Sequence, residues 1–433
     1  MIVTVIGLGK IGLPLAVQFA IKGHEVLGVD INPETVVLVN RGIEPFPGED
    51  KLQELLAQAV TSGSLRASLS TSECVAVSDV VVVIVPLKVN DLLEPDYSAI
   101  DSVTEDIAQR LKKGALVIYE TTLPIGTTRN RCGRIIEERS LLQMGVDFFL
   151  VFSPERVLTG RVFSDLRKYP KIVGGVNERS AVEGVKFYES VFDFDIRSDL
   201  ARPNGVWKVD SLEAAEFVKL AETTFRDVNI ALANTFARHA DHLQLDVYQI
   251  IEASNSQSFS HIHQPGVAVG GHCIPIYPIF YLAGDKGAEL VEVSRRQNAD
   301  MPHYFVSRIM EHVGELQGKK VLVLGASYRE NVKELSYSGA FQLIHHLESN
   351  GALPEIFDPL FTNTELSRSG LRPITSQLKE FEIAIVQTRD EEFFKLFIQN
   401  EFSNLRYIFD GRNLFRGVSP KSDVPIITLG RGS

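Results

Sequence analysis

The chain has 433 residues, of which 44% are hydrophobic and 23% are charged, and a formal net charge of −11. This length and apolar content predict two or three folded domains and exclude a disordered chain. The negative charge argues against a nucleic-acid partner, because binding to a phosphate backbone needs a clustered cationic surface.

Targeting and metal-binding signals are weak. The first residues run directly into an apolar segment without a secretory leader, and no uncharged apolar run reaches the roughly 18 residues of a spanning helix. We therefore expect a cytoplasmic chain with no membrane partner. His261 and His263 lack carboxylate or thiolate companions, so we expect no metal site. The cysteines are too far apart for a disulfide framework: Cys74, Cys132 and Cys273.

The N-terminal part alternates short apolar runs with helix-like segments, as a parallel sheet with crossover helices requires. The runs are continuous rather than alternating in polarity, which is typical of strands that are covered on both faces. This pattern predicts a doubly wound domain over residues 1–203. The predicted strands are 2–6, 25–30, 79–85, 115–120, 147–152 and 171–174.

A glycine-rich loop follows the first predicted strand and enters a predicted helix. Its residues are Gly7, Leu8, Gly9, Lys10, Ile11 and Gly12. Such glycines let a pyrophosphate approach the backbone amides of a helix N-terminus. Asp30 closes the second predicted strand, where it can accept hydrogen bonds from a ribose and repel a 2′-phosphate. A chance glycine pattern would lack this context, so the loop predicts NAD as the cofactor.

The middle of the chain predicts one long helix. Asp210 and Glu213 suggest a capping box, and no proline or glycine follows until after Leu243. The helix would have about 33 residues and a length of roughly 50 Å. It is too long for one small domain, so we expect it to lie in a helical domain, residues 204–305, and to offer a dimerisation surface. One apolar stripe runs along it: Ala214, Val218, Ala221, Phe225, Val228, Leu232 and Phe236.

The alternating pattern resumes from Lys319, with predicted strands at 320–324, 355–357, 383–386 and 407–409. We assign residues 306–433 to a second doubly wound domain. Gly325 stands alone at the turn that corresponds to the first glycine loop, which predicts a nucleotide other than a second dinucleotide. The fold class is therefore α/β, with two Rossmann-like domains joined by a helical domain with one long central helix.

Cys273 lies in the segment Gly270 to Pro275, behind two glycines and His272. Glycines let a substrate approach the backbone, and a neighbouring histidine can activate a thiol. The alternative, a buried inert thiol, fits the other two cysteines better. A nucleophilic cysteine together with a nicotinamide cofactor indicates an oxidation that passes through a thioester.

Several stretches of the chain match a known family in the same order. Besides the first glycine loop they are Glu120 to Thr128, Phe152 to Val157, Lys171 to Gly175, Lys219 to Glu222, Gly270 to Pro275 and Asp410 to Asn413. On these stretches the chain resembles the UDP-glucose/GDP-mannose dehydrogenase family, the nucleotide-sugar 6-dehydrogenases, over essentially its whole length. Within the family, Ser153 to Val157, Arg226 to Asn229 and Gly270 to Pro275 look most like the branch acting on UDP-N-acetylhexosamines.

The resemblance implies a four-electron oxidation of a sugar C6 alcohol to a carboxylate with two NAD per turnover. Cys273 would form the thiohemiacetal and thioester, and Lys219 would stabilise the oxyanions. Glu155 would assist proton transfer or activate water, and Thr122 would help to order that water. Spacing alone assigns Lys219 no role, because a lysine on the polar face of a helix is usually solvated.

The resemblance also implies the binding residues and partners. The C-terminal domain would hold the UDP of a UDP-sugar, and the long helix would form a homodimer. Beside the glycine loop and Asp30, the cofactor would contact Val85, Pro86, Thr122 and Arg329. The substrate would contact Glu155, Arg156, Val157, Lys219, His261, Gly270, Arg329 and Arg412.

Three departures from the family pattern stand out. Thr223 stands where the family usually has an Asn, four residues after the catalytic Lys, and as a candidate catalytic residue it offers a hydroxyl instead of an amide. Tyr277 replaces an Asp four residues after the cysteine. Residues 256–260 lack an Arg that many relatives send toward a neighbouring subunit. Two alternative functions therefore stay open: a single-step hydroxyacid or sugar-acid dehydrogenase of related domain plan, and a nucleotide-sugar-binding relative without turnover.

Overall fold

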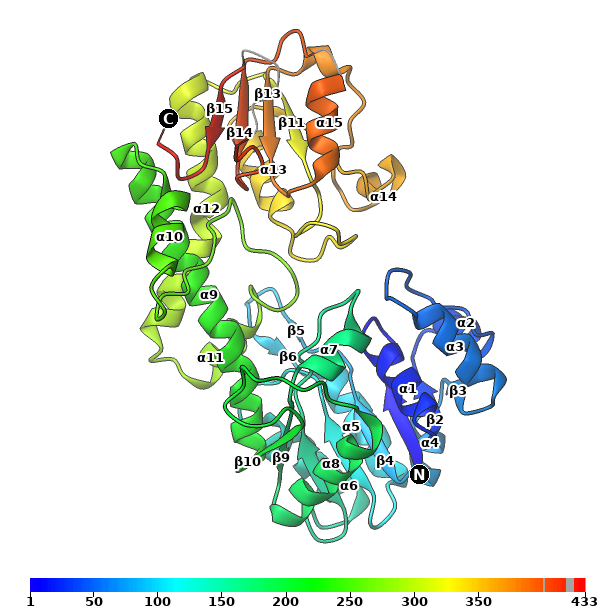
Figure 1. Ribbon diagram of the computed structural model, residues 1–433. Coiled ribbons are helices and arrows are strands. Elements are labelled where there is room, and N and C mark those ends of the chain that lie inside the picture. The colour runs from blue at the N-terminus through cyan, green and yellow to red at the C-terminus, as the bar shows by residue number, and fades with distance from the viewer. Residues whose placement is uncertain (400–401, 418–423, 433) are drawn as a thin grey trace. The chain divides into compact units, whose positions relative to one another are not determined.

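The computed structural model describes residues 1–399, 402–417 and 424–432 (Figure 1). The chain divides into two compact units, Met1–Ala221 and Glu222–Ser433. The boundary falls inside the helix α9 (Leu212–Leu243), so each unit is described by itself. The division into three domains at residues 203 and 305 stays a prediction.

Unit 1 contains an eight-stranded sheet in the order β10-β9-β8-β7-β4-β1-β2-β3. Neighbouring strands are parallel except for the antiparallel pair β8 and β9. The strands are β1 (Ile2–Ile6), β2 (Glu25–Val29), β3 (Leu65–Ser68), β4 (Val80–Val83), β7 (Leu116–Tyr119), β8 (Phe149–Phe152), β9 (Lys171–Gly175) and β10 (Val206–Val209). A small hairpin, β5 (Lys88–Val89) and β6 (Pro95–Asp96), stands apart from this sheet.

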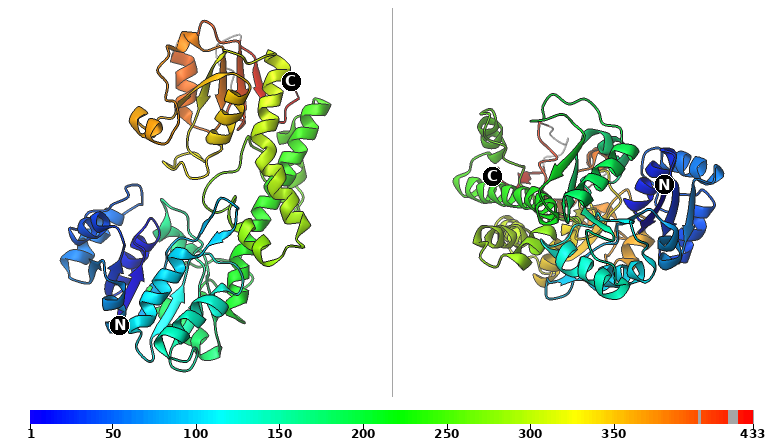
Figure 2. Two further views of the ribbon diagram at one scale, coloured as in Figure 1. Left: turned by 180° about the vertical axis from the view of Figure 1, so that it is seen from behind. Right: turned by 90° about the horizontal axis from the view of Figure 1, so that it is seen from below.

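Helices cover both faces of this sheet, as Figures 1 and 2 show. This explains why strands such as β4 and β7 are buried at every residue and read as unbroken apolar runs. The helices are α1 (Gly12–Ile21), α2 (Pro33–Asn40), α3 (Leu52–Thr61), α4 (Thr71–Val77), α5 (Ser98–Arg110), α6 (Arg134–Ser140), α7 (Val162–Lys168) and α8 (Glu178–Val191), with a π-helical turn η1 (Thr128–Gly133) before α6.

The predicted strands of unit 1 appear at the expected places, but β3 and β10 were not predicted. Both are four-residue strands at the two ends of the sheet. Each contains charged or partly exposed residues, so neither produces the continuous apolar run that marks a strand buried on both faces.

The predicted long helix is confirmed as α9, which has 32 residues. The predicted cap is wrong by one residue. The Ser211 hydroxyl, and not the side chain of Asp210, accepts the hydrogen bond from the Ala214 N–H at 3.1 Å. Serine and aspartate are both good N-cap residues, so the sequence does not distinguish Asp210 from Ser211 as the cap. The backbone conformation at the start of the helix decides between them.

Unit 2 contains a five-stranded parallel sheet in the order β12-β11-β13-β14-β15. The strands are β11 (Lys320–Leu324), β12 (Leu353–Phe357), β13 (Ile383–Val386), β14 (Tyr407–Asp410) and β15 (Ile426–Thr428). The helices are α10 (Val247–Asn255), α11 (Tyr277–Gly284), α12 (Glu289–Val313), α13 (Gly339–Ser349), α14 (Asn363–Arg368) and α15 (Glu391–Gln399), with a 3-10 turn η2 (Leu378–Glu380).

Polar contacts join α12 to the part of α9 that lies in unit 2, and the two helices run side by side in both views of Figure 2. Amide, carboxylate and guanidinium groups hydrogen-bond between them at 2.8 to 2.9 Å. The pairs are Asn234 with Asn298, Arg238 with Asp300, Asp227 with Asn298, and Asp241 with Tyr304. α9 therefore buries a polar face in unit 2.

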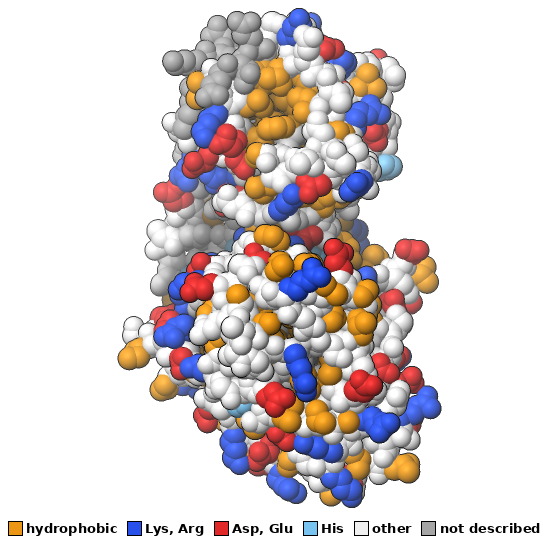
Figure 3. All heavy atoms as spheres, turned by 90° about the vertical axis from the view of Figure 1, so that its right-hand side faces the viewer, with side chains coloured by type: hydrophobic (Ala, Val, Ile, Leu, Met, Phe, Trp, Pro, Cys, Tyr) orange, Lys and Arg blue, Asp and Glu red, His pale blue; other side chains and the backbone are white. Residues whose placement is uncertain are grey.

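Charged side chains of both signs are mixed on the face of the molecule shown in Figure 3. None of the helices in the described part of the chain has the length and apolar character that crossing a bilayer needs. Among the described residues, no three His, Cys, Asp or Glu side chains gather as ligands of a metal ion would.

Candidate active site

The glycine loop joins β1 to α1 at the carboxyl edge of the unit 1 sheet. Gly7 has a φ of +97°, a backbone conformation that favours glycine. A Cβ at Gly12 would lie 1.8 Å from the Gly7 carbonyl oxygen, whereas a Cβ at Gly9 would meet no described atom within 4 Å. Two glycines are thus needed for the turn itself, and the third leaves open space for a ligand.

Asp30 follows β2 beside this loop. Its Oδ2 accepts a hydrogen bond from the Leu8 N–H, and its Oδ1 accepts one from the Asn32 N–H, each at 2.9 Å. The carboxylate therefore sets the loop conformation and remains at the strand end where a ribose hydroxyl would donate to it. The loop and the acid fit NAD.

Other predicted cofactor residues lie at the same edge of the sheet. The chain changes direction between β1 and β4, and ligands bind at such a switch point in open α/β sheets. Val85 and Pro86 follow β4, and Thr122 follows β7. The Thr121 hydroxyl donates to the Val85 carbonyl at 2.7 Å and so joins these two loops.

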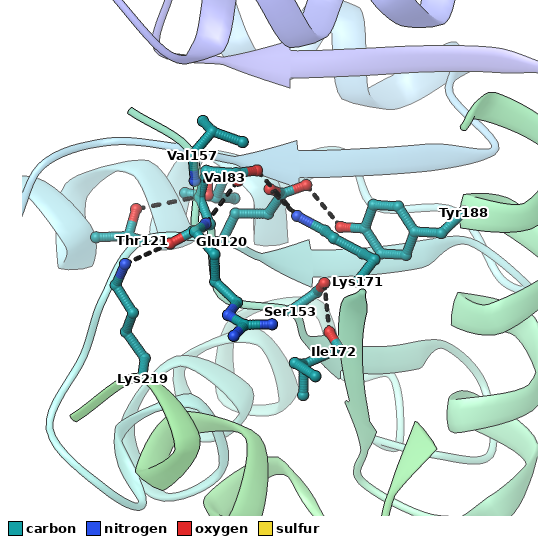
Figure 4. Close-up of polar contacts among 11 residues, drawn as sticks. Val83, Glu120, Thr121, Ser153, Val157, Lys171, Ile172, Tyr188 and Lys219 are labelled. Atoms are coloured by element: carbon teal, nitrogen blue, oxygen red, sulfur yellow. Dashed lines mark hydrogen bonds and ion pairs between the residues drawn. The ribbon is translucent and has the colours of Figure 1, made fainter. Parts of the chain in front are cut away.

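Glu155 lies in the loop after β8, and its carboxylate is partly buried. Figure 4 shows the surrounding contacts, with Val157, Lys171 and Lys219 labelled. Its Oε1 accepts hydrogen bonds from the backbone N–H groups of Arg156 at 2.6 Å and Val157 at 3.1 Å. Its Oε2 lies 3.0 Å from the Lys171 ammonium. The Glu155 backbone carbonyl accepts a hydrogen bond at 2.6 Å from Lys219 Nζ on α9. Glu155 and Lys219, predicted separately, are therefore in contact.

Lys171 also pairs with Glu120, which follows β7. The two side chains are buried and their charged atoms are 2.7 Å apart. Burial raises the pKa of Glu120, and the nearby Glu155 adds to this, while Lys171 opposes it. Burial would also raise the pKa of Glu155, but the charge of Lys171 and the hydrogen bonds to Glu155 outweigh it and lower that pKa. Glu155 is thus the carboxylate that keeps its charge.

Glu216 anchors the loop after β7 to α9, one turn before Lys219. Its Oε2 accepts from the Gly126 N–H at 2.5 Å, and its Oε1 accepts from the Thr128 N–H at 2.9 Å and from the Thr128 hydroxyl at 2.7 Å. Burial nevertheless raises the pKa of Glu216 to about 7, because these neutral donors replace only part of the lost hydration.

Unit 1 is expected to lose stability through Glu216 as the pH rises. The folded-state pKa of about 7 exceeds the ordinary value of 4.5. The protonated folded form is therefore favoured at low pH, and on the order of 3 kcal/mol is lost between about pH 5 and pH 8. Fluorescence of Trp207, the single tryptophan, reports urea unfolding of unit 1. The stability of wild type relative to Glu216→Gln should fall over this range.

Glu213→Gln, one turn earlier on α9, is the matched control for the pH dependence of stability. The hydrogen bond from Arg129 lowers the pKa of Glu213. Its contribution to stability is therefore present at neutral pH and is lost in acid, which is the opposite sign. If wild type and Glu216→Gln keep a constant difference from pH 5 to pH 8, the raised pKa of Glu216 is wrong.

In unit 2, the segment that carries Cys273 packs against the loop after β11. A Cβ at Gly270 would lie 2.6 Å from the Tyr337 carbonyl oxygen, and one at Gly271 would lie 2.8 Å from the Tyr328 ring. The Gly271 N–H also donates to the Ser336 carbonyl at 3.2 Å. The two glycines are therefore required by close packing, and they hold the partly exposed thiol at this position.

Two neighbours of Cys273 in the sequence, His272 and Tyr277, make contacts within unit 2. The Tyr277 N–H donates to the Cys273 carbonyl at 2.9 Å as α11 begins, and the Tyr277 ring packs on Phe280 with ring centres 5.7 Å apart. His272 Nε2 lies 3.9 Å from a carboxylate oxygen of Glu334. Tyr277 is thus an aromatic packing residue at the start of α11.

Arg295 on α12 holds the backbone just after the thiol and was not among the predicted site residues. Its guanidinium donates to the Ile274 carbonyl at 3.0 Å and to Asp227 of α9 at 2.8 Å. Burial raises the pKa of Asp227, although Arg295 and Asn298 oppose this. The signal in the sequence was a charged residue among the apolar positions of each helix: Asp227 in α9 and Arg295 in α12.

The four remaining predicted residues of unit 2 lie on different elements. Arg329 follows β11, and its Nε donates to the Tyr328 hydroxyl at 3.0 Å, beside the Gly270 segment. Arg412 follows β14 and donates to the carbonyls of Gln387 at 2.8 Å and Ala268 at 2.9 Å. His261 is exposed in the loop after α10, with its carbonyl bound by Asn229, while Thr223 is buried on α9.

A glycine loop between the first strand and the first helix, with an acid at the end of the second strand, defines a dinucleotide-dependent dehydrogenase. The family models agree along the chain. They match an NAD binding domain at residues 1–192, a central domain at 213–299 and a UDP binding domain at 322–417. The chain belongs to the UDP-glucose/GDP-mannose dehydrogenase family.

Known relatives span nearly the whole chain. A UDP-N-acetyl-D-mannosamine dehydrogenase of Pyrococcus horikoshii is 32% identical, covering 96% of this chain and 96% of the relative. An NDP-N-acetyl-D-galactosaminuronic acid dehydrogenase of Ralstonia solanacearum is 29% identical, covering 95% and 96%. A solved structure of the UDP-D-ManNAc dehydrogenase from Pyrococcus horikoshii has a TM-score of 0.89 and 31% identity, and covers all of both chains.

Proposed function

We propose that this protein oxidises the C6 alcohol of a UDP-N-acetylhexosamine to the carboxylate, with two NAD per turnover, for polysaccharide precursor synthesis. One observation carries the proposal: a partly exposed cysteine held by close-packed glycines, in a chain that has both an NAD binding domain and a UDP binding domain. Oxidation of an alcohol to an aldehyde alone would not need this thiol.

NAD supplies the hydride acceptor in both oxidation steps. The C6 alcohol loses a hydride and a proton to give the aldehyde, and the Cys273 thiolate adds to the aldehyde carbon. The addition gives the alkoxide of a thiohemiacetal, which loses a second hydride and becomes a thioester, and water cleaves the thioester to the acid and the free thiol. The Lys219 ammonium would stabilise the oxyanion in the addition and hydrolysis steps.

Lys219 suits this role because a neutral acceptor orients it. The Glu155 carbonyl fixes one N–H of the ammonium without cancelling its charge. The roles of Glu155 in proton transfer and of Thr122 in ordering water stay predictions. So do the roles of Thr223 and of the binding residues in unit 2.

The relatives favour an acetamido sugar. The two named above act on N-acetylated sugars by their names, one of the manno and one of the galacto configuration. The UDP binding domain favours the uridine nucleotide. UDP-N-acetylmannosamine is therefore the first substrate to test.

The test counts NADH and acid for each nucleotide sugar. UDP-ManNAc, UDP-GalNAc, UDP-GlcNAc, UDP-glucose and GDP-mannose are each incubated with NAD and purified protein. Two NADH and one uronate per sugar consumed are expected for a UDP-N-acetylhexosamine. One NADH per sugar would favour the single-step dehydrogenase, and binding of a nucleotide sugar without NADH would favour the non-catalytic relative.

We also propose that a second copy of the chain covers the exposed face of α9. An ordinary surface helix keeps its large apolar side chains on the covered face, whereas this helix exposes several of them and buries polar residues such as Glu216 and Asp227. The exposed residues are Phe217, Phe225, Leu232, Phe236 and Leu243, and Phe225 is 57% exposed. An apolar stripe of this length on a single chain indicates a protein interface. Two copies of one stripe form a self-complementary pair.

Charge on this stripe is expected to separate the dimer. Phe225→Glu and Leu232→Glu place a carboxylate where desolvation in the interface is costly. Sedimentation equilibrium should change from the dimer mass to the mass of one chain. Ile196→Glu, at an exposed apolar residue of unit 1, is the control and should leave the dimer intact. A wild-type protein that sediments as one chain would contradict the proposal.

A further inference from the structure

Four side chains of unit 1 form a polar network around Lys171: those of Glu120, Lys171 and Tyr188 are buried, and that of Glu155 is partly buried. Figure 4 shows Glu120, Lys171 and Tyr188 close together. Lys171 of β9 lies between the carboxylates of Glu120 and Glu155, at 2.7 and 3.0 Å. The Tyr188 hydroxyl of α8 donates to the other oxygen of Glu120 at 2.6 Å, and the Lys171 ammonium lies 4.8 Å from the centre of the Tyr188 ring.

Stability alone is a poor reason for such a network. Removing a lysine and two carboxylates from water costs several kcal/mol per ion, and well-packed apolar side chains often do as well as a buried ion pair. The surrounding core of unit 1 is apolar and aromatic, including Phe187 and Phe192. These charges are better explained by the backbone that they hold in place.

The network ends on that backbone. Glu155 uses one carboxylate oxygen for Lys171 and the other for the N–H groups of Arg156 and Val157. The carboxylate thereby closes a turn at residues 155–157. The turn directs the Glu155 carbonyl at the Lys219 ammonium, 2.6 Å away.

We propose that Lys171, Glu120 and Tyr188 are positioning residues that fix the Glu155 turn and through it the Lys219 ammonium. The network thus acts on catalysis without touching the substrate. This inference rests on the proposed function, because it assumes that Lys219 stabilises an oxyanion during the reaction. A misplacement of about 1 Å in such a group costs on the order of 100-fold in rate.

The charge distribution suits this task. Near neutral pH Glu120 holds a proton more readily than Glu155, since burial and the neighbouring carboxylate raise its pKa. Lys171 and the hydrogen bonds from Arg156 and Glu120 keep Glu155 ionised. An ionised carboxylate binds two backbone N–H groups more strongly than a neutral acid does.

Lys171→Met is the main test. It keeps a side chain of similar length and removes the charge, so kcat should fall by on the order of 100-fold. The dissociation constant of NAD should not change, because Gly7 to Gly12 and Asp30 do not contact the network. The acid limb of the kcat profile should move to higher pH, since Glu155 loses the cation that keeps it ionised. Lys171→Arg should restore part of the rate.

Lys208→Met is the matched control. Lys208 lies on the neighbouring strand β10 and pairs at 2.5 Å with Glu178 at the surface. It should leave kcat, the pH profile and NAD binding unchanged. A folded Lys171→Met protein with the kcat and pH profile of wild type would overturn the proposal.

A second readout does not depend on activity. Competitive acetylation followed by peptide mass spectrometry measures the reactivity of the Lys219 amine. Lys171→Met should loosen the hydrogen bond between the Lys219 amine and the Glu155 carbonyl, and the labelling of Lys219 should therefore increase. Lys208→Met should leave the labelling of Lys219 unchanged. If wild type makes no NADH, the proposed function fails while labelling still tests the network. If wild type is active and labelling does not change, the network proposal alone fails.

Tyr188→Phe covers the case in which Lys171→Met does not fold. It removes one hydroxyl and its hydrogen bond to Glu120 and keeps the aromatic packing. Lys219 labelling and kcat should change in the same directions as for Lys171→Met, by smaller factors. Wild-type values for both quantities would overturn the proposal.

Discussion

Cys273→Ser is expected to abolish uronate formation while NAD binding remains at the wild-type level. Serine has nearly the size of cysteine, so the packing of Gly270 and Gly271 around it is preserved. A neutral hydroxyl is a much weaker nucleophile than a thiolate, so the aldehyde is not captured. Chromatography with mass spectrometry should find no uronate, and the yield of NADH should not exceed one per sugar.

Hydroxylamine provides a direct test of the thioester. Added to wild-type protein during turnover, it should convert part of the acyl product to a hydroxamate, and Cys273→Ser should form none. Normal uronate output from Cys273→Ser would refute the covalent mechanism. The other two cysteines serve as controls.

The three thiols differ in environment. Cys273 is partly exposed, whereas Cys74 and Cys132 are buried. Burial raises the pKa of Cys132 to about 12, and burial also raises that of Cys74. Iodoacetamide should therefore label Cys273 first and stop NADH production, and Cys74→Ser should keep full activity. Activity that survives complete labelling of Cys273 would contradict its role.

Lys219→Met is expected to lower kcat by about 100-fold to 1,000-fold, the usual effect of removing one oxyanion donor. The methionine keeps the length of the side chain on α9 but cannot donate to the Glu155 carbonyl. The Michaelis constant for NAD should change little, because the cofactor loop between β1 and α1 does not include any part of α9, which carries Lys219. Steady-state rates with each substrate varied in turn measure both effects.

Lys186→Met is the control for this variant. Lys186 is an exposed residue of α8 that pairs with Glu183 at 2.7 Å. It should leave kcat unchanged. If Lys219→Met kept wild-type kcat with an intact fold by circular dichroism, another donor would have to stabilise the oxyanion.

The cofactor half of the site could be predicted from the sequence because its signals are local. The three glycines of the loop and Asp30 stand in a fixed order around a strand and a helix, and the sheet order then brings them to one edge. The thiol segment could likewise be recognised from adjacent residues, Gly270 to Pro275, but its packing against Tyr328 and Tyr337 could not, because these residues lie far along the chain. Local spacing encodes the cofactor loop directly.

The helix α9 shows what such signals leave out. Its apolar stripe predicts a dimerisation surface, and Phe225 and Leu232 of this stripe are exposed, but nothing in the spacing predicts that Glu216 and Asp227 are fully buried. Helical period indicates which residues share a face but not which face is covered. The partners of the buried charges come from other segments, such as Thr128 for Glu216 and Arg295 for Asp227.

The sequence by itself determined the α/β class, the dinucleotide loop, the long helix and the thiol segment, because each depends on residues close together in the chain. Only the tertiary structure decided how Glu155 is used, since its contacts with Lys171 and Lys219 lie 16 and 64 residues away. Contacts of that separation depend on strand order and on which donors share a buried space. Local propensity carries no information about either.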